Sequence, residues 1–129
     1  MNRALSTLVV SLSCVGLLAG CGSVDCVSVP PKLIETIKSS KKNQFVAFGD
    51  KYGGTPTKIA NQDGYVIGIE VIDNNDQSWT GVWRVGARGD TPIVVFSANT
   101  WAETTTSWPR DPRGEGDDER LVRKVETCL

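Results

Sequence analysis

The sequence predicts a mainly β fold of the α+β class, namely a small antiparallel sheet or open barrel with one short N-terminal helix. The clearest observation is the run GYVIGIEVIDNNDQSWTGVWRVG at 64–86, in which apolar side chains alternate on both sides of the polar stretch DNND. Two alternating runs around an Asn/Asp turn are typical of a β-hairpin. A second observation is a single segment with helical spacing near the start of the domain.

That helix is expected over Pro31–Ser40. Proline fits a first helical turn, where its missing N–H is not needed. Leu33, Ile34 and Ile37 then fall on one helical face, and the polar run SSKKN ends the element.

The hairpin is expected to supply the core of the sheet. Tyr65, Ile67, Ile69 and Val71 alternate onto one face before the turn. Three residues alternate after it: Trp79, Trp83 and Val85. The shared face predicts that both of these tryptophans pack in the core.

Three further strands are expected, at 45–48, at 92–98 and within TWAETTTSW at 100–108, where threonine favours β structure. The charged Pro/Gly run at 109–119 predicts a loop. The ending RLVRKVETCL is compatible with a strand or a helix, and we favour a closing strand because the neighbouring segments are β and valine is frequent.

The first twenty residues differ in character from the rest. Arg3 precedes an uncharged apolar stretch over Leu5–Leu18. A membrane-spanning helix needs about 20 apolar residues, so this shorter run predicts a signal peptide.

The sequence Leu18-Ala19-Gly20-Cys21 at the end of that run resembles the lipobox of bacterial lipoproteins. The resemblance implies a diacylglycerol on the sulfur of Cys21, cleavage before this cysteine, and a palmitate-type anchor in the membrane. It also implies sorting to the outer membrane, because Gly22 stands where aspartate favours inner-membrane retention, so that the domain faces the periplasm. The expected organisation is a signal peptide at 1–20, a lipidated tether at 21–30 and one β-rich domain at 31–129.

The four cysteines fit this interpretation. Cys14 leaves with the signal peptide, and a lipidated Cys21 cannot form a disulfide. Cys26 and Cys128 remain, in a compartment that permits disulfides, and a bond between them would close nearly the whole domain. The alternative is a pair of free thiols for metal binding or catalysis, but the chain has no histidine and no CxxC motif.

Composition points away from several functions. All 15 acidic residues and all but one of the 14 basic residues follow residue 20, so the domain is only slightly negative and nucleic acid is not an expected partner. No histidine, phosphate-binding glycine loop, GxSxG or SxxK sequence is present. We therefore expect no enzyme activity, no cofactor and no metal.

Three local patterns are better explained by structure than by function. Arg88-Gly89-Asp90 spells an integrin-binding tripeptide but suits a turn between strands. Asp73-Asn74-Asn75-Asp76 lacks the ligand spacing of a calcium loop and is expected to be the hairpin turn. The lysines at 32, 38, 41 and 42 either face anionic lipid headgroups or, as we favour, are simply solvated.

The remaining tryptophans suggest a binding surface. Trp101 and Trp108 are seven residues apart, so on an extended strand they point to opposite faces and one of them is exposed. Trp108 adjoins the charged loop and is the preferred partner contact, with Trp101 as the other candidate.

The expected function is a non-catalytic binding or assembly subunit of the cell envelope, anchored by its lipid and contacting an envelope protein. Two alternatives remain. Phage and plasmid lipoproteins that block a receptor are similar in size and tether, and periplasmic lysozyme inhibitors are similar in size and in their small β-barrel.

Overall fold

The computed structural model describes residues 25–113 and 119–129. The predictions for the signal peptide and for lipidation of Cys21 concern residues outside these ranges. The described elements are α2 (Pro31–Lys38), β1 (Ala47–Ile59), β2 (Gln62–Ile72), β3 (Ser78–Arg88), β4 (Thr91–Ser97), α3 (Thr100–Thr105) and α4 (Glu119–Glu126).

The strands form one antiparallel sheet in the order β1-β2-β3-β4, so each strand pairs with its neighbour in sequence. The predicted mainly β class is confirmed, and the sheet is open. In the central hairpin Tyr65 pairs with Val85 and Val71 with Trp79, which matches the alternation in the sequence. The turns at 73–76 and 88–90 lie between strands, as expected.

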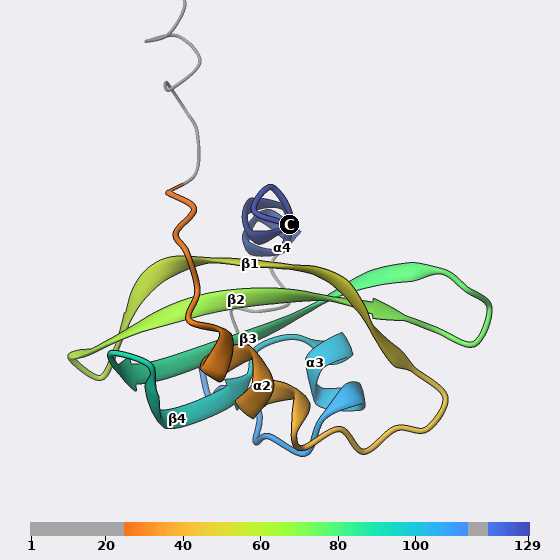
Figure 1. Ribbon diagram of the computed structural model, residues 1–129, viewed down its shortest axis with the longest axis horizontal. Coiled ribbons are helices and arrows are strands. Elements are labelled where there is room, and N and C mark those ends of the chain that lie inside the picture. Colours follow the sequence, from red (N-terminus) through yellow and green to blue (C-terminus); the bar gives the residue numbers. More distant parts are fainter. Residues whose placement is uncertain (1–24, 114–118) are drawn as a thin grey trace, which may run out of the picture.

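Helices cover both faces of the sheet. The helices α2 and α3 lie on one face and α4 on the other (Figure 1). The larger apolar cluster lies under α2 and includes Leu33, Ile37, Ile67, Ile69, Trp83 and Val85. A smaller cluster lies under α4 and contains Val66, Val82, Ala98 and Val125.

The first strand is much longer than the four apolar residues at 45–48 suggest. It begins at Ala47 and continues to Ile59 through a segment rich in glycine and polar residues. Because β1 is an edge strand, Pro56 and the exposed polar side chains are tolerated there. The strand expected at 92–98 is present as β4.

The strand expected within 100–108 is wrong, since Thr100–Thr105 forms the short helix α3. Asn99 caps this helix with its side chain, accepting a hydrogen bond from the backbone N–H of Ala102. A local cap therefore outweighs the β preference of the threonines.

The favoured closing strand is also wrong, because Glu119–Glu126 forms α4. Val125 is fully buried, and a Cβ on Gly68 would lie 2.4 Å from its Cγ1 atom. The glycine in β2 thus leaves space for a close helix, and Leu121, Val122 and Val125 use it as one apolar face.

A disulfide joins Cys26, before α2, to Cys128, after α4, across 102 positions of sequence. It links the start of the described chain to the helix on the opposite face from α2. Among the helices of the two described ranges, none has the length and apolar character needed to cross a membrane.

Candidate functional site

An aromatic pair lies at the surface where β3 begins. The rings of Trp79 and Trp101 stack with centroids 4.9 Å apart and an interplanar angle of 21°. Trp79 is 41 % exposed, whereas Trp101 is partly buried against the larger core cluster. The prediction that Trp79 packs in the core is wrong, although it does share a sheet face with Trp83.

Gly81 lies between Trp79 and Trp83 in β3 and helps to explain why only Trp83 is fully buried. A Cβ on Gly81 would lie 2.5 Å from the ring of Trp83, so this indole covers the glycine and is fully buried. Trp79 lies nearer the turn, where its indole is hydrogen-bonded to Asp73 and 41 % exposed. Strand alternation shows which face of the sheet a side chain occupies, but it does not show how far the buried core extends along the strand.

Asp73 fixes the indole of Trp79. Its Oδ2 atom accepts a 2.8 Å hydrogen bond from Trp79 Nε1, and its Oδ1 atom accepts from the backbone N–H groups of Asn75 and Gln77. The bond from Trp79, followed by the backbone bond from Gln77, lowers the pKa of Asp73. The carboxylate beside the exposed indole therefore stays charged near neutral pH.

Asn99 fixes the other indole by holding α3 against the sheet edge. Its Oδ1 atom accepts from the backbone N–H groups of Val82 and Ala102, both at 3.0 Å. Its Nδ2 atom donates to the carbonyl of Thr80 at 2.9 Å. One buried side chain thus caps the helix and continues the hydrogen bonding of β3 beyond the end of β4, which sets the position of Trp101.

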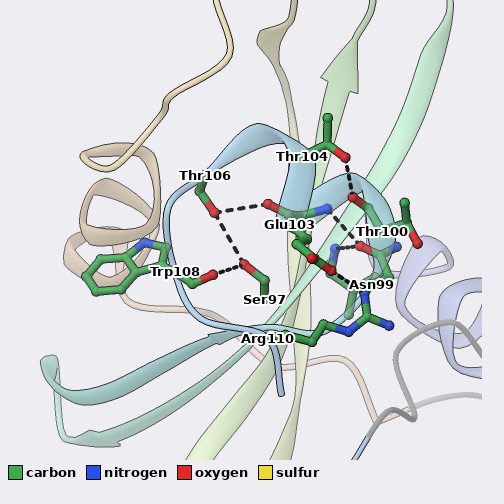
Figure 2. A network of polar contacts seen from close by, with 10 residues as sticks. Ser97, Asn99, Thr100, Glu103, Thr104, Thr106, Trp108 and Arg110 are labelled. Carbon is green, nitrogen blue, oxygen red and sulfur yellow. Dashed lines mark hydrogen bonds and ion pairs between the residues drawn. The ribbon is translucent and has the colours of Figure 1, made fainter. Parts of the chain in front are cut away.

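Figure 2 shows the polar contacts around α3, including those at its C-terminal end. Trp83 Nε1 donates to Thr106 Oγ1 at 3.0 Å, and this hydroxyl donates to the carbonyl of Ala102 at 3.1 Å. Ser97 Oγ donates to the carbonyl of Trp108 at 2.8 Å. These buried hydroxyls hold backbone and indole groups in place, which is a structural role.

Trp108 is less exposed than we expected from the sequence. It is partly buried against the larger core cluster, and its Nε1 atom donates to the carbonyl of Ile37 at 3.2 Å. The expectation assumed a strand through both Trp101 and Trp108, whereas the chain here is a helix followed by an extended segment. Of the two tryptophans proposed for partner binding, Trp101 is the one at the aromatic pair.

A hollow of about 320 Å³ adjoins the aromatic pair. It lies between β3, the start of α3 and the end of α4. Its lining residues are Ser78, Trp79, Thr80, Asn99, Thr100, Trp101, Val122 and Glu126. We refer to this hollow as the indole cleft.

A larger hollow of about 770 Å³ lies at the opposite ends of the strands. Its lining includes Val27, Tyr65, Arg88 and the exposed ion pair between Lys58 and Asp63. These charged groups are well solvated, and no aromatic stack lies there within the described residues. We therefore place the candidate site at the indole cleft, although it is smaller.

Most of the lysines at 32, 38, 41 and 42 are exposed to solvent. Lys32, Lys41 and Lys42 are exposed, while Lys38 lies 5.6 Å from the ring centroid of Phe48. Among residues 25–113 and 119–129, no three histidine, cysteine or acidic side chains are grouped closely enough to hold a metal ion.

No protein-family model matches this chain, and no curated protein or solved structure matches it.

Proposed function

We propose that this chain is a non-catalytic binding subunit of the bacterial cell envelope, held at the outer membrane by a lipid on Cys21 with its domain facing the periplasm. The anchor rests on the sequence Leu18–Cys21, which resembles a lipobox. The binding role rests on the indole cleft, and its partner would be another envelope protein.

The observation that carries the binding role is the exposed stack of Trp79 on Trp101. A large aromatic surface that is held in place before binding loses little conformational entropy when a partner covers it. Here Asp73 restrains one ring and the Asn99 cap restrains the element that bears the other.

The buried hydroxyls near α3 have structural roles. The hydroxyls of Ser97 and Thr106 are buried, and both donate to backbone carbonyls. The sequence has no histidine to serve as a general base near neutral pH.

A lipid anchor would make a modest contact surface sufficient. Each buried methylene of an acyl chain contributes about 0.8 kcal/mol, so two or three chains hold a protein firmly on a bilayer. Confinement beside a membrane partner then raises the effective concentration of the binding surface.

Site-specific photocrosslinking of the full chain in bacterial cells tests this proposal. A benzoylphenylalanine at position 79 should form one discrete crosslink to an envelope protein, whereas the same group at position 45 should not. Phe45 is the matched control because it is an aromatic residue with 64 % exposure outside the indole cleft.

A Cys21→Ala variant separates the anchor from the binding surface. It should lose labelled palmitate, leave the membrane fraction and give a weaker crosslink from position 79. Equal crosslinking from positions 79 and 45, or palmitate incorporation without Cys21, would contradict the proposal.

A further inference from the structure

We infer that the indole cleft receives an extended, basic peptide segment of the partner, which lies along the uncovered edge of β3. This inference rests on the proposed binding function and specifies the chemistry of what is bound. It follows from three observations: an exposed strand edge, two unlike walls beside it, and carboxylates around it.

The strand edge is exposed because β4 is shorter than β3. The strand β4 pairs only with residues 83–88 of β3, and Ala98 and Asn99 supply the next hydrogen bonds, to Val82 and Thr80. In an antiparallel sheet alternate residues direct both backbone groups to the same edge. The N–H of Thr80 and the backbone of Ser78 therefore face the indole cleft.

The walls of the cleft suit the alternating side chains of an added strand. Trp101 belongs to α3 and Trp79 stacks on it, whereas Val122 and Glu126 belong to α4, which lies on the other face of the sheet (Figure 1). Successive side chains of an extended peptide point to opposite faces. A peptide on this edge would thus direct one side chain to the indoles and the next to Glu126.

The charge around the cleft favours a cation. Glu126 is the charged residue of the lining, and the carboxylate of Asp73 accepts the N–H of Trp79. Glu70 of β2 accepts a 2.7 Å hydrogen bond from Ser78 Oγ at the start of β3. Lys51 lines the adjoining hollow together with Glu70 and Glu126, so acidic groups outnumber basic ones there.

An exposed tryptophan face next to carboxylates is a favourable site for arginine or lysine, because the ring quadrupole attracts a cation. Adding a strand to an edge supplies backbone hydrogen bonds, and the side chains supply specificity. A neutral oligosaccharide could stack on the same ring, but it would use neither the backbone edge nor the charge.

The test uses the full chain in detergent micelles with ¹⁵N-labelled indoles, whose four resonances are assigned by single Trp→Phe variants. The probe is a capped five-residue peptide of arginine, whose successive side chains reach both walls of the cleft. It should shift the resonances of Trp79 and Trp101 and leave that of the buried Trp83 unchanged. A matched peptide of five glutamates should bind at least about 10-fold more weakly, and salt should weaken arginine-peptide binding.

Two variants and two controls locate the contact. Trp79→Ala should weaken peptide binding about 3- to 10-fold, and Glu126→Gln, which keeps the shape of the side chain, should weaken it about 2- to 5-fold. Phe45→Ala and Glu35→Gln change exposed residues elsewhere and should leave the affinity unchanged. A peptide methylated at its backbone nitrogens should bind at least about 5-fold more weakly, because it cannot donate to the strand edge.

Equal binding of the two charged peptides, or unchanged affinity after backbone methylation, would overturn the inference. Shifts produced by chitotetraose but not by the arginine peptide would overturn it in favour of a glycan. If the peptide does not bind but the crosslink from position 79 persists, the basic-strand inference fails and the proposed function survives. Loss of the crosslink with retained peptide binding would overturn the proposed envelope partner, while the affinity of the cleft for a basic strand would stand.

Discussion

Arg84 of β3 and Asp111 form an ion pair inside the protein, with Arg84 Nε 2.8 Å from Asp111 Oδ2 and the two side chains 5 % and 2 % exposed. The contact is ionic rather than a well-aligned hydrogen bond. Asp111 also accepts a hydrogen bond from the backbone N–H of Arg113 and donates its own N–H to the carbonyl of Ser97. The pair thus attaches the segment that follows Trp108 to the sheet.

Removing the negative partner should destabilise the fold strongly. Asp111→Asn removes the negative charge 2.8 Å from the buried guanidinium of Arg84, and the expected loss in the free energy of unfolding is about 3–5 kcal/mol. Urea denaturation followed by circular dichroism measures this loss. The control is Asp63→Asn, which disrupts the exposed pair with Lys58 and should cost at most about 1 kcal/mol. Similar losses in both variants would show that burial of the Arg84 pair does not matter.

The sequence predicted those elements whose pattern is set by burial on one face. Apolar residues recur at the strand period in the 64–86 hairpin and at the helical period in α2, and both elements are present. Most of the long edge strand β1 was missed. After Phe48 it consists largely of glycine, proline and polar residues, which give no alternation of apolar side chains. The helix α4 was misassigned because its apolar residues fit both periods, and the deciding factor was the space above Gly68.

The candidate site was predicted only in part. Trp101 was named from the sequence, but its stacking partner Trp79 was placed in the core. The available signal was Asn99, an N-cap residue before Thr100, which marks a helix start within a threonine-rich run. Neither the uncovered edge of β3 nor the approach of Glu126 has a local sequence pattern, since both depend on the relative lengths and packing of distant elements.

Asn99 should contribute far more to stability than an ordinary surface asparagine. Asn99→Ala removes the cap of α3 and leaves the N–H of Val82 and the carbonyl of Thr80 without their side-chain partner. We expect a loss of about 2–4 kcal/mol in the free energy of unfolding, together with reduced stacking of Trp101. Asn43→Ala removes a single exposed bond to the N–H of Phe45 and should cost less than about 1 kcal/mol. Urea titrations compare the variants, and equal losses would contradict the assignment.

The close approach of α4 to the sheet should make Gly68 intolerant of a methyl group. Gly68→Ala places a Cβ atom against Val125 Cγ1, so we expect a loss of about 1–3 kcal/mol in unfolding free energy. Val125→Ala alone should cost about 2 kcal/mol. The double variant should cost less than the sum, because the second change removes the clash. Strict additivity in thermal or urea unfolding would refute direct contact.

The disulfide should stabilise the domain chiefly by constraining its unfolded chain. Replacing Cys26, Cys128 or both by serine should lower the unfolding free energy by about 2–5 kcal/mol, and the double variant should lose no more than either single variant. Reducing the parent chain should lower its stability by a similar amount, while the double variant should not respond to the reductant. A single-cysteine variant as stable as the parent would show that the bond is dispensable.

The contact between Asp73 and Trp79 should respond to acid in a defined direction. The pKa of Asp73 in the folded protein lies below its ordinary value of 3.8, so the stabilisation it provides is present above that value and disappears as the pH falls through the lower folded-state pKa. The indole N–H resonance of Trp79 should therefore titrate with a midpoint below pH 3.8, because protonation weakens the hydrogen bond to Oδ2. In Asp73→Asn this transition should vanish while the buried indole of Trp83, bound to Thr106, keeps its position. A midpoint above pH 3.8, or a titration that persists in the asparagine variant, would mean that another group controls the exposed indole.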